Sequence, residues 1–221
     1  MNKQTKIEKE LNFILPLWGE QKKSFSLLLA LNRSHKYMND LQRHTDLFAL
    51  MGNKLVEIII LDTCKMFEYN PNYGISIPNL FAQAEQLFTE QYFEENKNNL
   101  WKNCTFSELR LILNEVDSKL KKIRKLIIRI KHPRNKLIGH YDRKIDTIQK
   151  AEKFYLNSNN NLSFSEYTEI CSVGDEVLKT IKFVLFGHHM TITCNENYED
   201  DLDRIAYALQ QINSNEFNKL N

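Results

Sequence analysis

Hydrophobic residues recur every three or four positions along most of the chain, a spacing that places them on one face of a helix. Near the N-terminus this pattern predicts helices over residues 3–14 and 17–38. We expect an interruption near Pro16, because proline lacks the backbone N–H that a helix interior requires. Residues 45–66 are apolar on most faces and predict a central helix that begins near Thr45.

The middle of the chain contains a long amphipathic segment. Thr105 and Glu108 form a T-x-x-E capping box, which predicts a helix from there to about Lys131. Pro133 disfavours helical geometry for the residue before it, so we expect a break or kink near His132. The apolar positions that define the core face of this helix are Leu109, Ile112, Val116, Leu120, Ile123, Ile127 and Ile130.

The remaining periodic segments also predict helices. They cover residues 78–95 after a cap at Ser76, 145–156, 163–186 after a capping box of Ser163 and Glu166, and 198–212, which is acidic. There is no internal repeat and no clear linker. We therefore predict one all-α domain over residues 1–221, a helical bundle with a core at about 45–186 and helical extensions at both ends.

Composition supports this fold class and narrows the environment. The chain has 221 residues, 42% of them hydrophobic, and only 6 Gly and 4 Pro, too few for the turns of an all-β protein. No apolar run approaches the roughly 20 residues that span a bilayer, and the polar N-terminus lacks a signal-peptide core. Four scattered cysteines form no paired zinc ligands and no dense disulfide framework. We predict a cytoplasmic protein with reduced thiols and no membrane partner.

Basic residues are concentrated in one stretch, although the net charge of the chain is only +2. Between Lys119 and Lys144 there are eleven Lys or Arg residues and one acid, Asp142, so this stretch carries +10 and the rest carries −8. Such a stripe fits a polyanion such as RNA. It also fits an amphipathic helix whose basic residues pair with acids elsewhere, and the sequence leaves both interpretations open.

Residues 132–142, "HPRNKLIGHYD", place several ionisable side chains close together at the end of the basic stretch. Cleaving RNA without a metal needs groups that move protons and a cation that stabilises the charge on the phosphate. His140 suits the proton transfer because imidazole titrates near neutrality, and Arg134 suits the phosphate because its planar donors match two oxygens. Lys136, one helical turn before His140, favours the neutral imidazole. Asn135 fits either a helix cap or a place in the site.

Helix geometry alone does not bring Arg134 and His140 to one face, because six residues separate them by roughly 120° around an ideal helix. An irregular helix start after Pro133, the long arginine side chain, or a two-fold dimer that combines two copies of the segment would each bring the groups together.

Arg134, Asn135 and His140 form the pattern Arg-Asn-x4-His, which resembles the R-x(4–6)-H motif of the HEPN superfamily. On a chain of this size the segment is similar to standalone abortive-infection HEPN proteins. The resemblance implies a helical bundle that dimerises and a metal-independent endoribonuclease, a defence or toxin-like effector, with its site at the dimer interface. By position, Arg134 corresponds to the phosphate-binding arginine, Asn135 to its polar partner and His140 to the catalytic histidine.

The resemblance also implies partners and further contacts. RNA and a second copy of the chain are expected, an antitoxin or regulatory protein is an open partner, and neither a metal nor a cofactor is expected. We interpret Lys131, Lys136 and Arg143 as RNA-binding charges. Family members silenced by a nucleotidyltransferase often carry a tyrosine two residues after the histidine. Here that position is Asp142, preceded by Tyr141, so silencing through that tyrosine is not expected.

Two alternatives remain open from the sequence. The chain fits a non-catalytic HEPN-like dimer that binds RNA or a protein through its basic stripe. It also fits a purely structural dimer in which the basic face pairs with the acidic segment at 197–204. For single residues, Arg134 fits an ion pair with Glu57 or Asp62, and the adjacent His188 and His189 fit surface or packing roles better than a metal site.

Overall fold

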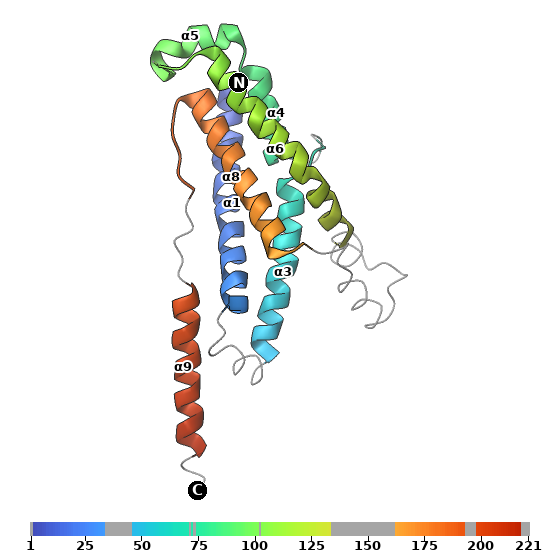
Figure 1. Cartoon of the computed structure of the whole chain (residues 1–221), viewed down its shortest axis with the longest axis vertical. Helices are drawn as coiled ribbons and strands as arrows, with labels where there is room; N and C mark the ends of the chain where they lie inside the picture. The colour runs from blue at the N-terminus through green and yellow to red at the C-terminus, as the bar shows by residue number, and fades with distance from the viewer. Residues whose placement is uncertain are drawn as a thin grey trace. The chain divides into compact units, whose positions relative to one another are not determined.

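The structure is a computed structural model that describes residues 2–33, 46–70, 72, 74–101, 103–133, 162–192 and 198–217. Within these ranges the chain forms helices and no strand, so the predicted all-α class is confirmed. The helices, labelled in Figure 1, are α1 (Lys3–Arg33), α3 (Asp46–Met66), α4 (Ile77–Leu87), α5 (Glu90–Leu100), α6 (Phe106–Pro133), α8 (Phe164–Phe186) and α9 (Tyr198–Phe217).

The chain divides into two compact units. The first unit contains Met1–Gly19 and Ile60–Thr193, and the second unit contains Glu20–Ile59 and Cys194–Asn221. The boundaries between the units fall inside α1 and α3, so each of these two helices has one part in the first unit and the other part in the second. The predicted single domain with a core at about 45–186 stays a prediction.

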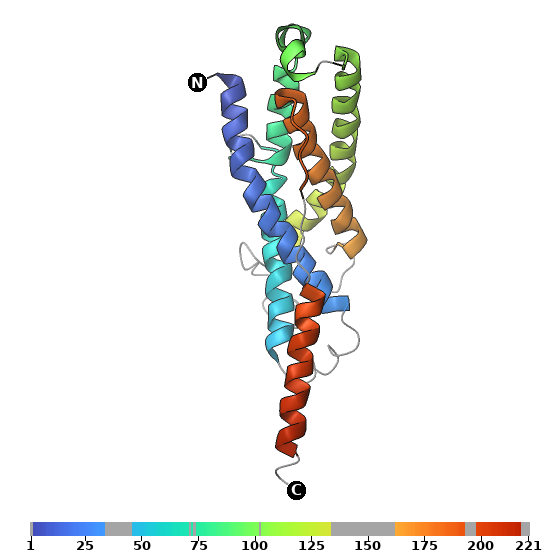
Figure 2. The same cartoon turned by 90° about the vertical axis from the view of Figure 1, so that its left-hand side faces the viewer.

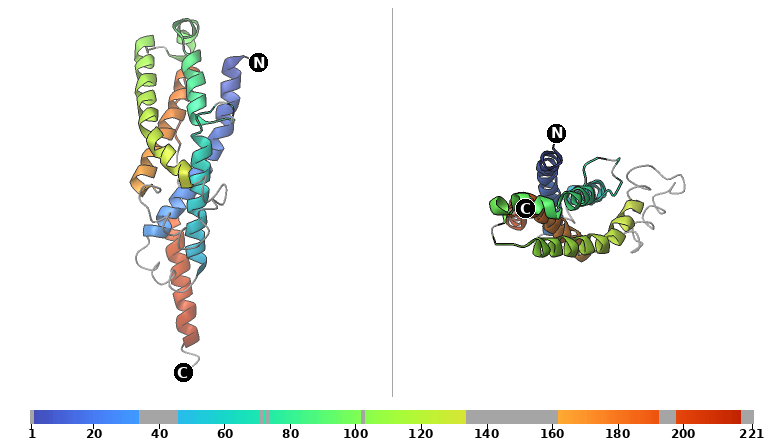
Figure 3. Two further views of the ribbon diagram at one scale, coloured as in Figure 1. Left: turned by 90° about the vertical axis from the view of Figure 1, so that its right-hand side faces the viewer. Right: turned by 90° about the horizontal axis from the view of Figure 1, so that it is seen from above.

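Helix α8 is at the centre of the first unit. It packs against both α4 and α6, which lie on either side of it in Figure 2. Seen end-on in the right-hand view of Figure 3, α8 lies between α6 and the beginning of α1. Buried side chains recur along its whole length, from Tyr167 to Phe186. The buried side chains of α8 therefore determine how the other helices of this unit pack against it.

A tryptophan and a glycine make the contact between α1 and α8. Trp18 is fully buried, and its indole Nε1 donates a hydrogen bond of 2.6 Å to Oδ1 of Asp175. A Cβ atom at Gly174 would lie 2.5 Å from Cζ2 of the Trp18 ring, so the two helices approach this closely only because residue 174 has no side chain. Trp18 also packs edge-on against Phe67 at the end of α3, with ring centroids 5.9 Å apart.

Both capping boxes predicted from the sequence are confirmed. The backbone N–H of Thr105 donates to Oε2 of Glu108 at 2.8 Å, and the N–H of Glu108 donates to Oγ1 of Thr105 at 3.2 Å, immediately before α6. Ser163 and Glu166 make the same reciprocal pair at the beginning of α8. Gly187 ends α8 in the left-handed conformation, with φ of 66°, which glycine adopts without strain.

The predicted interruption of the first helix at Pro16 is wrong, because α1 continues through this residue. Proline removes one backbone hydrogen bond from a helix and leaves the carbonyl of the residue four positions earlier without its partner. That residue is Asn12, and Asn12 and Pro16 are both exposed, so water can hydrate the carbonyl. The buried Ile14 and Trp18 hold the helix on its other face.

The predicted single helix over residues 78–95 is also wrong, because two helices occupy this part of the chain. Ser76 caps α4 as predicted, accepting a hydrogen bond from the N–H of Asn79. The helix then ends before Phe88, and Thr89 caps α5 through the N–H of Tyr92. Phe88 is buried in an aromatic cluster that it forms with Tyr92, Phe93, Trp101 and Phe106. This tertiary packing, which a local pattern does not contain, explains the bend.

The second unit has a small core of its own. Ala30 and Leu31 of α1 pack with Phe48 of α3 and with Leu202 and Ala206 of α9. Helix α9 continues to Phe217, beyond the predicted end at 212. No helix within the described ranges has the length and apolar composition needed to cross a membrane.

The contact between Trp18 and Gly174 predicts the effect of one methyl group. We expect Gly174→Ala to lower the free energy of unfolding by about 2 kcal/mol, because the added methyl group would overlap the buried ring of Trp18. Gly19→Ala is the control, since no atom outside the neighbouring backbone of its own helix lies within 4 Å of its added Cβ, and we expect it to raise stability by up to about 1 kcal/mol. Urea unfolding measures both changes. Equal stability of the two variants would contradict this account of the α1–α8 contact.

Candidate active site

Most residues of the sequence-predicted site lie outside the part of the chain that the structure describes. These are Arg134, Asn135, Lys136, His140 and Arg143. Lys131, in the last turn of α6, is described, as are the elements on either side of residues 134–161. The described residues therefore show how the chain is held where the predicted motif begins.

An ion pair joins the end of α6 to the beginning of α8. Nη2 of Arg129 lies 2.5 Å from Oε2 of Glu166, and both side chains are about two-thirds buried, with exposed fractions of 29% and 31%. The same carboxylate accepts a hydrogen bond of 2.8 Å from the backbone N–H of Ser163. Together Arg129 and Ser163 lower the pKa of Glu166 from 4.5 to about 2. The last described turns of α6 and the first turn of α8 are consequently held together at one end of this helix pair.

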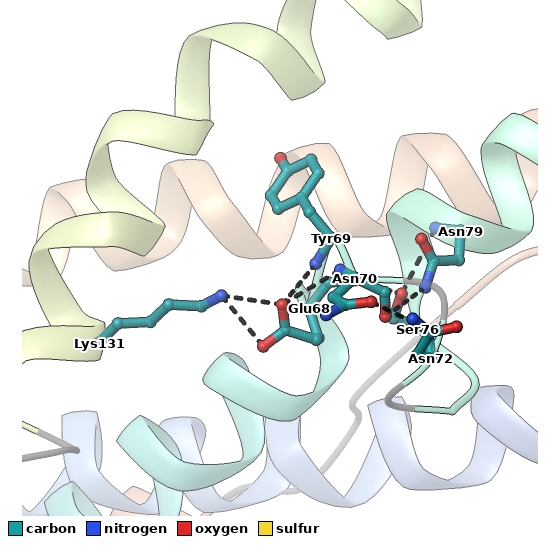
Figure 4. A network of polar contacts seen from close by, with 7 residues as sticks. All are labelled: Glu68, Tyr69, Asn70, Asn72, Ser76, Asn79 and Lys131. Carbon is teal, nitrogen blue, oxygen red and sulfur yellow. Dashed lines mark hydrogen bonds and ion pairs between the residues drawn. The ribbon is translucent and has the colours of Figure 1, made fainter.

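A second ion pair attaches the last turn of α6 to the end of α3. Nζ of Lys131 lies 3.1 Å from each carboxylate oxygen of Glu68, as Figure 4 shows. Oε1 of Glu68 also accepts hydrogen bonds from the backbone N–H groups of Tyr69, at 2.9 Å, and Asn70, at 3.2 Å. Burial alone would raise the pKa of Glu68, but the hydrogen bonds from Lys131 and Asn70 outweigh it, and the pKa lies below its usual value.

The connection between α3 and α4 is part of the same network. Oγ of Ser76 donates to the carbonyl of Glu68 at 2.5 Å and accepts the N–H of Asn79 at 3.4 Å, and Nδ2 of Asn79 donates to the carbonyl of Asn70 at 3.4 Å. Figure 4 shows these groups converging on the loop beside Glu68. The cap of α4 and the anchor of α6 are thus fixed by one hydrogen-bonded cluster.

These contacts change the interpretation of Lys131 and add residues that the sequence did not single out. Lys131 was interpreted as an RNA-binding charge, and in the structure its ammonium is paired with Glu68, with 25% of its side chain exposed. Glu68 and Glu166 therefore hold the last turns of α6, immediately before the predicted motif. No local motif marks Glu68, whereas the capping box marks Glu166.

The basic face of α6 is divided into two flanks. On the flank toward α8, Nζ of Lys119 lies 2.5 Å from Oε1 of Glu176, and Nζ of Lys122 lies 3.3 Å from Oε1 of Glu169. With Arg129 and Glu166, three cations face three carboxylates here. For this flank the structure favours the interpretation in which the basic residues pair with acids of the protein.

An open groove lies along this neutralised flank. Its volume is about 430 Å³, and it is lined by Lys119, Lys122, Ser165, Thr168, Glu169, Ser172, Val173 and Glu176. Because its lysines already face glutamates, the groove lacks the excess positive charge that a polyanion requires.

The two adjacent histidines outside the motif are both exposed. The ring of His189 stacks on Phe183 with centroids 4.6 Å apart, which is a packing role. Within the described ranges no group of three or more His, Cys, Asp or Glu side chains is arranged to hold a metal ion.

Comparison with known proteins gave one family match. A family model described as AbiU2, of the HEPN type (HEPN_AbiU2), matches residues 9–205. This range covers most of the chain and extends on both sides of residues 45–186, the predicted core of the bundle. No curated protein and no solved structure matches the chain.

The lowered pKa of Glu166 predicts a specific loss of stability in acid. A carboxylate with a depressed folded-state pKa stabilises the fold above about pH 4.5, and this stabilisation disappears as the pH falls toward 2. Glu166→Gln keeps a side-chain oxygen for the capping box but loses the charge, so the free energy of unfolding should depend less on pH between 4.5 and 2 than in the parent. Urea unfolding across this range measures the difference.

Glu169→Gln is the matched control for this prediction. It removes a carboxylate from the same helix, where the partner Lys122 is highly exposed and the distance is 3.3 Å. We expect its acid dependence to follow the parent more closely. If the two variants show the same dependence on pH, the Arg129–Glu166 pair does not hold the end of α6 in the way described.

Proposed function

Because the chain belongs to the AbiU2 family of HEPN abortive-infection proteins, we propose that it is a metal-independent endoribonuclease that uses Arg134 and His140. The observation that carries the proposal is the Arg-Asn-x4-His sequence directly after the basic helix α6, inside the range that the family model matches. Neither feature alone is sufficient, because short motifs of this kind occur by chance.

The proposed reaction is an attack of the ribose 2′-oxygen on the neighbouring phosphorus. His140 takes the proton from the 2′-hydroxyl, the bond between O2′ and phosphorus forms, and the bond between phosphorus and O5′ breaks. Arg134 binds the phosphate oxygens and stabilises the negative charge that increases in the transition state. The products are a 2′,3′-cyclic phosphate and a 5′-hydroxyl, and the histidine of a second copy of the chain protonates the leaving oxygen in the dimeric site that we propose.

The anchoring of α6 supports this use of the segment. A catalytic arginine has to be held close to its productive position, because small displacements from that position cost much of the rate. The ion pairs Arg129–Glu166 and Lys131–Glu68 fix the last turns of α6 immediately before the motif. Asn135, Lys136 and Arg143 supply the remaining polar contacts to RNA in this proposal.

The alternative is a non-catalytic module that binds RNA or a protein through the whole basic stripe. Pairing of Lys119, Lys122 and Arg129 with acids of α8 weakens this alternative, since three of the eleven cations of the stripe already face carboxylates within the chain. An antitoxin or regulatory partner is compatible with either function.

Cleavage of RNA in the presence of a chelator tests the proposal. The parent protein should cut a labelled mixed-sequence RNA and leave cyclic phosphate ends, and His140→Ala should reduce the rate by roughly 100-fold or more, because the proton acceptor is lost. His188→Ala is the control, since it removes an exposed histidine outside the motif and should leave the rate unchanged.

Three results would contradict the proposed nuclease activity. Equal cleavage by the parent and by His140→Ala would show that another group or a contaminant cuts the RNA. If the parent protein cuts RNA without the chelator and does not cut it with the chelator, the reaction needs a metal. A folded parent that binds RNA without cutting it would favour the non-catalytic module.

A further inference from the structure

We propose that single-stranded RNA docks on the outer face of α6, formed by Lys121, Arg124, Lys125 and Ile128, and that Arg124 and Lys125 are the cations that bind its phosphates. This inference rests on the proposed function, because it assigns the path of the substrate toward the motif. It divides the basic stretch into residues that bind RNA and residues that hold the fold together.

The direction of each side chain on α6 separates these two groups. The core side of the helix carries Leu120, Ile123, Ile127 and Ile130, all buried. At about 100° per residue, Lys125 points about 180° away from the centre of that side. Lys119, Lys122 and Arg129 lie on the flank toward α8, whereas Arg124 and Lys131 lie on the opposite flank, toward the end of α3.

Ion pairing within the chain leaves only part of this charge available. Among the seven cations from Lys119 to Lys131, five face a carboxylate in the described part of the chain. Lys121 belongs to these five, since it pairs with Asp117 one turn earlier on its own helix. Arg124 and Lys125, both exposed, make no ion pair with any described residue. The excess positive charge of α6 is therefore concentrated on two adjacent residues.

Tyr69 holds Arg124 in place without neutralising it. Cζ of Arg124 lies 4.8 Å from the centroid of the Tyr69 ring, in a cation–π contact. The ring is itself fixed, because its hydroxyl donates a hydrogen bond of 3.3 Å to the carbonyl of Leu120, on α6. The guanidinium thus keeps its full charge and loses little conformational freedom when it binds a phosphate, which favours affinity.

Single-stranded RNA fits this surface better than an acidic protein segment does. Ile128, with 59% of its side chain exposed, lies one turn from Arg124 and Lys125 and offers apolar contact to a base or ribose beside the charges. Helix α6 is continuous to Pro133, about 14 Å further along its axis than Arg124. The end of α6, where the predicted motif begins, is therefore within a few nucleotides of this face.

The test compares two double variants of the full chain that remove the same charge from the same helix. Both are made in the His140→Ala background, so that the RNA stays intact, and binding of a labelled mixed-sequence single-stranded RNA is followed by fluorescence anisotropy at several salt concentrations. Arg124→Ala with Lys125→Ala should weaken binding roughly tenfold at low salt and reduce the slope of log K against log salt by about 1.4.

Lys119→Ala with Lys122→Ala is the control and should leave the slope close to that of the background. This control is strict, because it leaves Glu176 and Glu169 without partners and so adds repulsion toward RNA. Tyr69→Leu should weaken RNA binding in part. Tyr69→Phe, which retains the ring beneath Arg124, should bind RNA as the His140→Ala background does. Equal losses in the two double variants would overturn the proposal, as would displacement of RNA by poly-glutamate at equal charge concentration.

Cleavage kinetics with His140 intact separate this inference from the proposed function. Loss of Arg124 and Lys125 should raise KM and leave kcat unchanged, because these residues bind substrate away from the reacting atoms. If the parent cuts RNA and the two double variants share one KM, the docking surface is wrong and the nuclease stands. If the parent cuts no RNA but its binding depends on Arg124 and Lys125, the docking surface stands and the nuclease is wrong.

Discussion

Helix α8 packs against α4 and α6 and also contacts α1 and α3, and its tight fit is the constraint on which the first unit depends. Gly174 lets the ring of Trp18 lie directly on the helix. On another side, the hydroxyls of Thr63 and Tyr167 hydrogen-bond at 3.0 Å in a buried position. Because interiors are close-packed, a helix held on several sides has little freedom to shift. It can therefore act as a fixed support for α6.

The carboxylates of α8 also determine which cations of α6 are available to a ligand. Glu166, Glu169 and Glu176 form a stripe along one side of the helix, and each faces a cation of α6. The pairs at Glu169 and Glu176 are exposed and contribute little to stability, so their larger effect is on the distribution of charge. Charge is cancelled where α6 meets α8 and remains at Arg124 and Lys125. A count of basic residues alone would not distinguish the cations that face α8 from Arg124 and Lys125.

Features that depend on neighbouring residues were predictable from the sequence, and features that depend on distant ones were not. Ser76, Thr105 and Ser163 were predicted as caps because a cap is completed within three residues. The path of α1 through Pro16 was not predictable, since it depends on which face of the helix is buried. The anchors of α6 join residues that are 37 and 63 positions apart, and no spacing rule connects them.

The paired carboxylates also bear on what Arg134 is free to bind. An arginine that follows a basic helix can be neutralised by an acid of its own chain, and Glu57 and Asp62 were the acids that the sequence offered for this. Glu57 lies 2.7 Å from Lys54, and Asp62 lies 3.9 Å from Lys65, so both already have a cation beside them. At the end of α6, Glu68 and Glu166 are likewise paired. Binding to a carboxylate that already has a cation gains less Coulomb energy, because the two cations repel each other. This supports the proposal that Arg134 binds a phosphate, which brings its own negative charge.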